Sequence, residues 1–319
     1  MTSKIEEARH KPLSVWRLGP PQMRGVLAAA LFAGVFFVGV FYSSFKKRQA
    51  FPRRSAEFPT APRINEAVAA AEAHLKENPQ DIAGLAKLGI LHFEKGKDFY
   101  IEAINELEEA RDLGALDSRI FYCLGIMYQE TGLYSFAMEE YKRFLRNHPE
   151  DKEVRMLLAK LLYQQKQFPE AIEEYERLKF YFPKDSMVEE NLGLSLWGNK
   201  NTERAIESFN HLKTFGSEQA RRAELYLGQV DYDAGQYQRA LDHLLLSLPK
   251  EGEQAVGLPL DRVQAALAMT YQKLNKPEDA KLAWEKVLSL APGDVKAQAA
   301  LKELNRKFPP KKQKPAAKK

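Results

Sequence analysis

The chain has 319 residues and a formal net charge of +5, and its single cysteine, Cys123, excludes an internal disulfide. Positive charge is concentrated at the two ends: residues 1–62 carry ten basic and three acidic side chains, and residues 307–319 carry six lysines and no acid, which leaves residues 63–306 with a net charge of −8. A nucleic-acid-binding protein carries its positive charge on the folded domain, so we expect no nucleic-acid partner.

Residues 25–45 form an uncharged apolar segment between a basic N-terminal tail, residues 1–24, and a basic, proline-containing linker, residues 46–62. A helix of this length spans about 31 Å at 1.5 Å per residue, which matches the hydrocarbon core of a bilayer. A cleaved signal peptide is the alternative, but the segment is long for one and no small-x-small cleavage site follows it directly. We therefore predict a transmembrane helix over residues 25–45, through which the protein contacts the membrane.

Basic residues flank both ends of the apolar segment, so its orientation stays open. Within 15 residues of the segment, three basic side chains precede it and five follow it. By the positive-inside rule this difference favours a cytoplasmic location for the remainder of the chain, with the periplasm or another exoplasmic space as the alternative. We expect a single-pass protein of a bacterial inner or plasma membrane; a mitochondrial outer-membrane protein is the second interpretation.

After the linker, alanines recur with a period close to 34 residues, which is typical of a helix-turn-helix solenoid. The alanines are Ala67, Ala103, Ala137, Ala171, Ala205, Ala240 and Ala280. In six of the seven cases a large apolar residue follows four positions later: Leu107, Tyr141, Tyr175, Phe209, Leu244 and Trp284.

Glycine and proline also occupy regular positions around these alanines. A Leu-Gly pair often lies twelve residues before the alanine, as at Gly125, Gly193 and Gly228. Glycine inside a helix costs about 0.5–1 kcal/mol relative to alanine, so its presence indicates that another helix approaches the backbone closely. Prolines about twelve residues after the alanine end the second helix of each pair. The turns within pairs are expected at Gly96, Gly132, Gly198-Asn199, Gly235 and Asn275.

This pattern resembles the tetratricopeptide repeat (TPR) family over residues 63–306. The resemblance implies an all-α, right-handed helical solenoid of about six helix pairs. Residues 63–78 and 294–306 are expected to be capping helices at its two ends.

In proteins of this family the first helix of each pair usually lines a concave groove that binds partner proteins. The resemblance therefore implies a partner-binding groove made of Arg119, Tyr122, Ile126, Met156, Lys160, Tyr163, Leu194, Trp197, Leu225, Gln229 and Tyr232. The apolar and aromatic members of this set exceed what one core needs, and surplus apolar surface in a concavity marks a binding site. In the alternative interpretation, Tyr163, Trp197 and Tyr232 only cover the turns beneath them.

No enzyme or metal motif is present in the sequence. The six histidines lack metal-ligand spacing, and GxSxG, GxGxxG and GxxxxGK[ST] motifs are missing. We interpret the carboxylate runs at 106–109, 139–140 and 173–174 as solvated helix surface, and His92 as a packing residue. We expect no catalytic residue, no metal and no cofactor.

Residues 307–319 are interpreted as a disordered Lys/Pro-rich tail, which either keeps the protein soluble or contacts anionic lipid or an acidic partner. The sequence thus predicts a membrane-anchored TPR scaffold that assembles or regulates a membrane-associated complex through its groove. The alternatives are a receptor or chaperone-like adaptor for translocating polypeptides and a non-catalytic regulatory subunit of a membrane enzyme complex. The oligomeric state and the partner's identity are not predicted.

Overall fold

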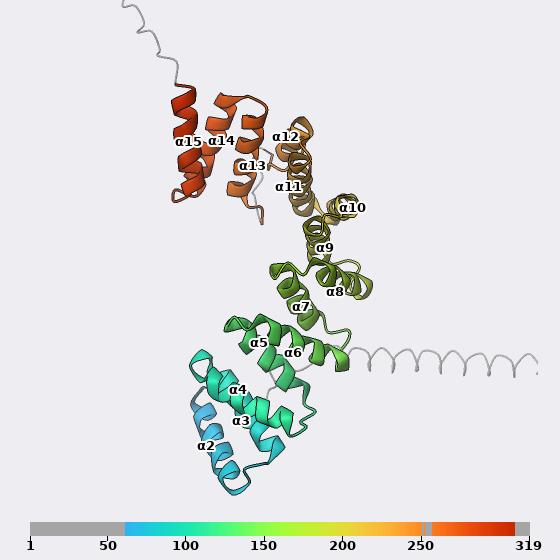
Figure 1. Ribbon diagram of the computed structural model, residues 1–319, viewed down its shortest axis with the longest axis vertical. Helices are drawn as coiled ribbons and strands as arrows, with labels where there is room; N and C mark the ends of the chain where they lie inside the picture. Colours follow the sequence, from blue (N-terminus) through green and yellow to red (C-terminus); the bar gives the residue numbers. More distant parts are fainter. Residues whose placement is uncertain (1–60, 251, 253–256, 310–319) are drawn as a thin grey trace, which may run out of the picture. The chain divides into compact units, whose positions relative to one another are not determined.

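The computed structural model describes residues 61–250, 252 and 257–309, which form fourteen α-helices (Figure 1). Each helix contacts the helix that follows it, so the prediction of an all-α solenoid is confirmed. The helices are α2 (Ala61–Glu77), α3 (Ile82–Lys95), α4 (Tyr100–Asp112), α5 (Ser118–Glu130), α6 (Tyr134–Asn147), α7 (Lys152–Gln164), α8 (Phe168–Tyr181), α9 (Ser186–Gly198), α10 (Thr202–Leu212), α11 (Ser217–Asp233), α12 (Tyr237–Leu246), α13 (Leu260–Lys273), α14 (Pro277–Leu290) and α15 (Val295–Lys307).

One part of the predicted fold class is wrong. The sequence predicts a transmembrane helix ahead of the array, but none of the helices in the described residues is long and apolar enough to cross a membrane. Residues 25–45 themselves lie outside the described residues, as do the tail at 1–24, the linker up to residue 60 and the segment 310–319. The fold class of the described part of the chain is therefore the helical solenoid alone.

Helices α3 to α14 form six pairs, and we call the first helix of each pair its A helix and the second its B helix. The most extensive helix contacts are those within a pair. The remaining two helices cover the ends of this row: α2 packs on α3, and α15 packs on α14. Helix α15 fully buries only Ala297 and Leu304, as expected of a cap with one apolar side.

The recurring alanines lie in the core of the pairs. Ala103, Ala137, Ala171, Ala205, Ala240 and Ala280 are all 0% exposed, whereas Ala67 on α2 is half-buried. The mid-helix glycines are explained by the large residue four positions after the alanine. A Cβ at Gly125 would lie 2.5 Å from the Tyr141 ring, and one at Gly193 would lie 2.6 Å from the Phe209 ring. In these pairs the B helix thus places a bulky side chain directly on the backbone of its A helix.

The ends of the helices follow local sequence signals. Asp151 and Asp185 cap the starts of α7 and α9, accepting hydrogen bonds from backbone N–H groups of the first turn. One expected turn is shifted: Gly198 is the last residue of α9, and Lys200 adopts the left-handed conformation (φ 63°) instead. Gly198 serves packing, because a Cβ there would lie 2.5 Å from the Phe168 ring of the preceding B helix.

Candidate partner-binding face

The eleven predicted groove residues lie on four successive A helices. Helix α5 carries Arg119, Tyr122 and Ile126, α7 carries Met156, Lys160 and Tyr163, α9 carries Leu194 and Trp197, and α11 carries Leu225, Gln229 and Tyr232. Two of them are buried, Met156 at 9% exposure and Leu225 at 2%, and present little surface to a partner. Lys160 is exposed, and the other eight are half-buried. We call these nine accessible residues the A face.

Neighbouring helices hold the aromatic side chains of the A face in place. The Tyr122 hydroxyl on α5 donates to the Glu153 carboxylate on α7 at 3.3 Å. The Tyr163 ring packs edge-on against Phe168, with 5.6 Å between ring centroids. Tyr232 packs in the same way against Tyr237 at 5.4 Å. Each of these two rings therefore covers the start of its own B helix on one side and keeps part of its surface exposed.

Charged groups next to the A face are paired with one another. Arg222 on α11 contacts the Glu190 carboxylate on α9 at 2.5 Å, and the Tyr226 hydroxyl donates to the same carboxylate at 2.5 Å. Burial, together with the bond to the Glu190 carboxylate, raises the pKa of Tyr226 to about 12. The Arg119 guanidinium pairs with Asp117, the N-cap of its own helix. The Glu190 contacts join two A helices across a pair boundary.

The interpretation of the carboxylate runs as solvated surface is wrong for one residue in each of two runs. Glu140 is 3% exposed, and Arg111 and Arg143 contact its Oε1 atom at 3.0 and 2.8 Å. Glu174 is 9% exposed and pairs with Arg155 and Arg177. Burial raises the pKa of Glu140 while the two guanidinium groups oppose this change. These carboxylates lie between helices, where a charge without a partner would be costly.

A repeated spacing connects the buried polar groups within pairs. Arg155 on α7 bonds to Glu174, and Glu224 on α11 bonds to the His243 ring at 2.5 Å; both pairs are 19 residues apart. The two pairs occupy the same repeat positions, with the carboxylate on the B helix in the first pair and on the A helix in the second. A carboxylate and an arginine or histidine 19 residues apart, at fixed distances from the recurring alanines, are the sequence signal that could have identified these contacts. His92 is likewise a packing residue, 5% exposed and bonded to Glu106 at 2.7 Å.

Within the described part of the chain, no cluster of His, Cys, Asp or Glu side chains is arranged to hold a metal ion. The Cys123 thiol is buried on α5, and burial raises its pKa strongly.

Comparison with known proteins identifies the type of repeat. Residues 122–186 and residues 261–294 match models of the tetratricopeptide repeat. The first segment contains most of α5 and all of α6 to α8, and the second contains most of α13 and all of α14. No curated protein matches the sequence.

Several solved structures are similar in fold. The C-terminal part of a TPR repeat-containing protein from Cytophaga hutchinsonii is 17% identical, with a TM-score of 0.56 over 75% of this chain and 95% of that one. A chain in a structure of Naa15/Naa10 bound to HypK-THB is 20% identical, with a TM-score of 0.49 over 76% of this chain but only 37% of its own length. Pseudomonas aeruginosa PilF is 18% identical, with a TM-score of 0.46 over 76% of this chain and 98% of that one. The described residues thus form an all-α helical solenoid in which residues 122–186 and 261–294 match the tetratricopeptide repeat.

Proposed function

We propose that this protein is a non-catalytic scaffold that binds a segment of another protein on its A face. The observation that carries this proposal is a row of aromatic side chains on successive A helices, Tyr122, Tyr163, Trp197 and Tyr232, that remain half-buried after the helix pairs have packed. Large aromatic side chains at partly desolvated positions are the commonest anchors of protein interfaces.

The surroundings of these rings favour a ligand with apolar side chains. Ile126 and Leu194 are half-buried on the same helices as two of these rings and add apolar surface to the A face. The buried carboxylate of Glu190 on α9 already has two partners on α11, so it has little to offer an incoming group. An extended or helical peptide that inserts apolar side chains between the aromatic rings fits this arrangement.

The test compares partner recovery for two double variants of the tagged full-length protein, purified from its native cells. Tyr163→Ala with Trp197→Ala removes two central anchors and is expected to lose the specific partner. The matched control, Phe136→Ala with Tyr134→Ala, removes two exposed aromatic side chains from the B helix α6 and is expected to retain it. Loss of the partner in both variants, or in neither, would show that the A face is not the binding surface.

A further inference from the structure

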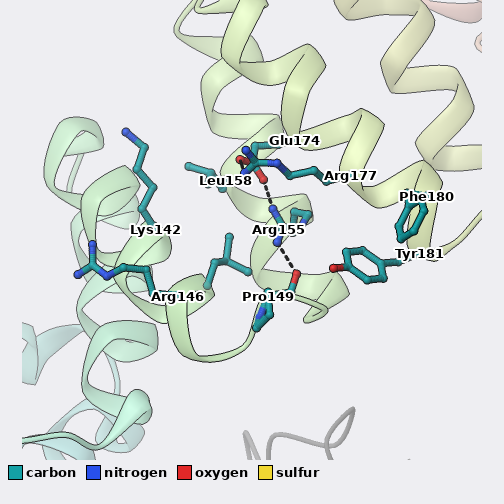
Figure 2. A pocket seen from close by; sticks show the side chains of 10 residues that line it. Lys142, Arg146, Pro149, Arg155, Leu158, Glu174, Arg177, Phe180 and Tyr181 are labelled. Atoms are coloured by element: carbon teal, nitrogen blue, oxygen red, sulfur yellow. Dashed lines mark hydrogen bonds and ion pairs between the residues drawn. The ribbon is translucent and has the colours of Figure 1, made fainter. Parts of the chain in front are cut away.

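A second candidate surface lies on a different side of the third helix pair. A cavity of about 430 Å³ opens between α6, α7 and α8 (Figure 2). Successive residues of an α-helix are about 100° apart, so Leu158 of α7, which lines this cavity, points away from Lys160 and Tyr163 of the A face. The cavity is lined by Lys142, Leu145, Arg146, Pro149, Arg155, Leu158, Glu174, Arg177, Phe180 and Tyr181.

The lining is strongly cationic. It contains two lysine or arginine side chains from α6, one from α7 and one from α8, but a single carboxylate, Glu174. Arg155 donates to Glu174 and to the Pro149 carbonyl, and Arg177 contacts the other oxygen of Glu174 at 2.8 Å (Figure 2). The one acidic group is therefore already shared by two guanidinium groups. The lining keeps a net charge of +3 within an array whose net charge is −8.

The cations on α6 are available to a ligand. Arg146 is exposed and forms none of the ion pairs found among the described residues. Lys142 pairs only with Glu139, at 3.0 Å, and both side chains are at least half exposed. Exposed surface pairs of this kind contribute little to stability, so a ligand carboxylate exchanges with Glu139 at little cost.

Aromatic side chains line the opposite side of the cavity. Phe180 is 80% exposed and Tyr181 is 41% exposed, and their rings meet edge to face at 5.3 Å. Figure 2 shows both rings across the cavity from Lys142 and Arg146. A cavity of this size is far larger than a single small anion requires, since a water molecule occupies about 30 Å³ in the liquid. A ligand that combines negative charge with an apolar group therefore matches both sides of the cavity.

We propose that this cavity binds an acidic segment of a partner protein, with at least two carboxylates directed at Lys142 and Arg146 and an aromatic or aliphatic side chain on Phe180. Charge complementarity selects this occupant. The terminal segments of this chain outside the described residues have the wrong sign: residues 1–60 carry ten basic and three acidic side chains, and residues 310–319 carry five lysines and no acid. The site is separate from the A face and adds a second point of attachment.

The test uses fluorescently labelled peptides and the full-length protein, with binding followed by fluorescence anisotropy. A peptide of four Glu-Glu-Phe repeats is expected to bind, and one of four Gln-Gln-Phe repeats to bind at least about tenfold more weakly. The variant Lys142→Glu with Arg146→Glu is expected to reduce binding of the acidic peptide by about tenfold or more. Its control, Lys286→Glu with Lys302→Glu, makes the same charge change at exposed sites on α14 and α15 and is expected to bind normally.

Further variants distinguish peptide binding in this cavity from binding on the A face and from general attraction to a cationic surface. Phe180→Ala is expected to weaken binding of the acidic peptide severalfold, whereas Trp197→Ala on the A face is expected to leave it unchanged. Equal loss in both charge-reversal variants, or loss on Trp197→Ala alone, would overturn the proposal. Displacement of the peptide by inorganic phosphate would also overturn the proposal if sodium chloride at the same ionic strength had no effect. That result would assign the cavity to small anions.

Discussion

Replacing Gly125 with alanine tests how the A and B helices pack. The new Cβ would lie 2.5 Å from Cε1 and 2.7 Å from Cδ1 of Tyr141. The ring cannot move aside easily, because Tyr141 is 0% exposed and its hydroxyl donates to Gln129 at 2.9 Å. Overpacking of this kind costs about 1–3 kcal/mol, and the higher helix propensity of alanine returns about 0.5–1 kcal/mol. We expect Gly125→Ala to destabilise the α5–α6 pair by about 1–2 kcal/mol.

The single cysteine supplies a local assay. Cys123 lies on the same helix, is 4% exposed, and has a pKa raised by burial, so a thiol reagent reaches its thiolate only when the helix pair opens. When reclosing is faster than labelling, the labelling rate follows the population of the open form. A loss of about 1–2 kcal/mol then accelerates labelling about 5- to 30-fold.

Two further variants identify the cause. Gly293→Ala places a Cβ where no other atom lies within 4 Å, so the labelling rate of Cys123 should not rise. Combining Gly125→Ala with Tyr141→Leu should remove the penalty of the new methyl group, giving a favourable coupling energy in a double-mutant cycle. A labelling rate unchanged by Gly125→Ala alone would refute the reasoning, since it would show that the Tyr141 ring does not rest on the α5 backbone.

Two more predictions concern charged groups. Glu174→Ala leaves the buried Arg155 without its carboxylate and should lower the free energy of unfolding in urea by about 3–5 kcal/mol. Its control, Glu173→Ala, changes a side chain that is 68% exposed and should lower it by under about 0.5 kcal/mol. Similar losses in the two variants would contradict the buried pair. Burial favours a higher pKa for Asp185, but the Lys152 ammonium and backbone N–H groups outweigh it and lower the pKa below the usual 3.8. The ionised Asp185 carboxylate stabilises the fold above its unfolded pKa and loses that effect as the pH falls through its folded pKa. In thermal melts, the stability advantage of the wild type over Asp185→Asn should therefore shrink on acidification below 3.8. A stability difference that is independent of pH would exclude the ion pair as its source.

The sequence was sufficient to predict the helix pairs because their packing positions are chemically specific. A glycine such as Gly125 lies where a bulky side chain such as Tyr141, four residues after a small one such as Ala137, contacts the helix backbone. The buried carboxylates were not predicted, because Glu139 and Glu140 are the same residue type in one run and only the packing of α6 shows that Glu140 faces Arg111. The cavity between α6, α7 and α8 was not predicted either, since it depends on how two pairs stack and not on a motif.

The contact between Arg222 and Glu190 has a consequence for the order of the repeats. The apolar residues of each pair would suit almost any neighbour, but Arg222 needs a carboxylate from the pair before it. In a chain without α9 and α10, α11 would follow α8, and the position equivalent to Glu190 would hold Met156, which offers no charge. Pairs of nearly identical construction are therefore not interchangeable modules. At this boundary the neighbour is selected by a polar residue that the α7–α8 pair lacks at the equivalent position.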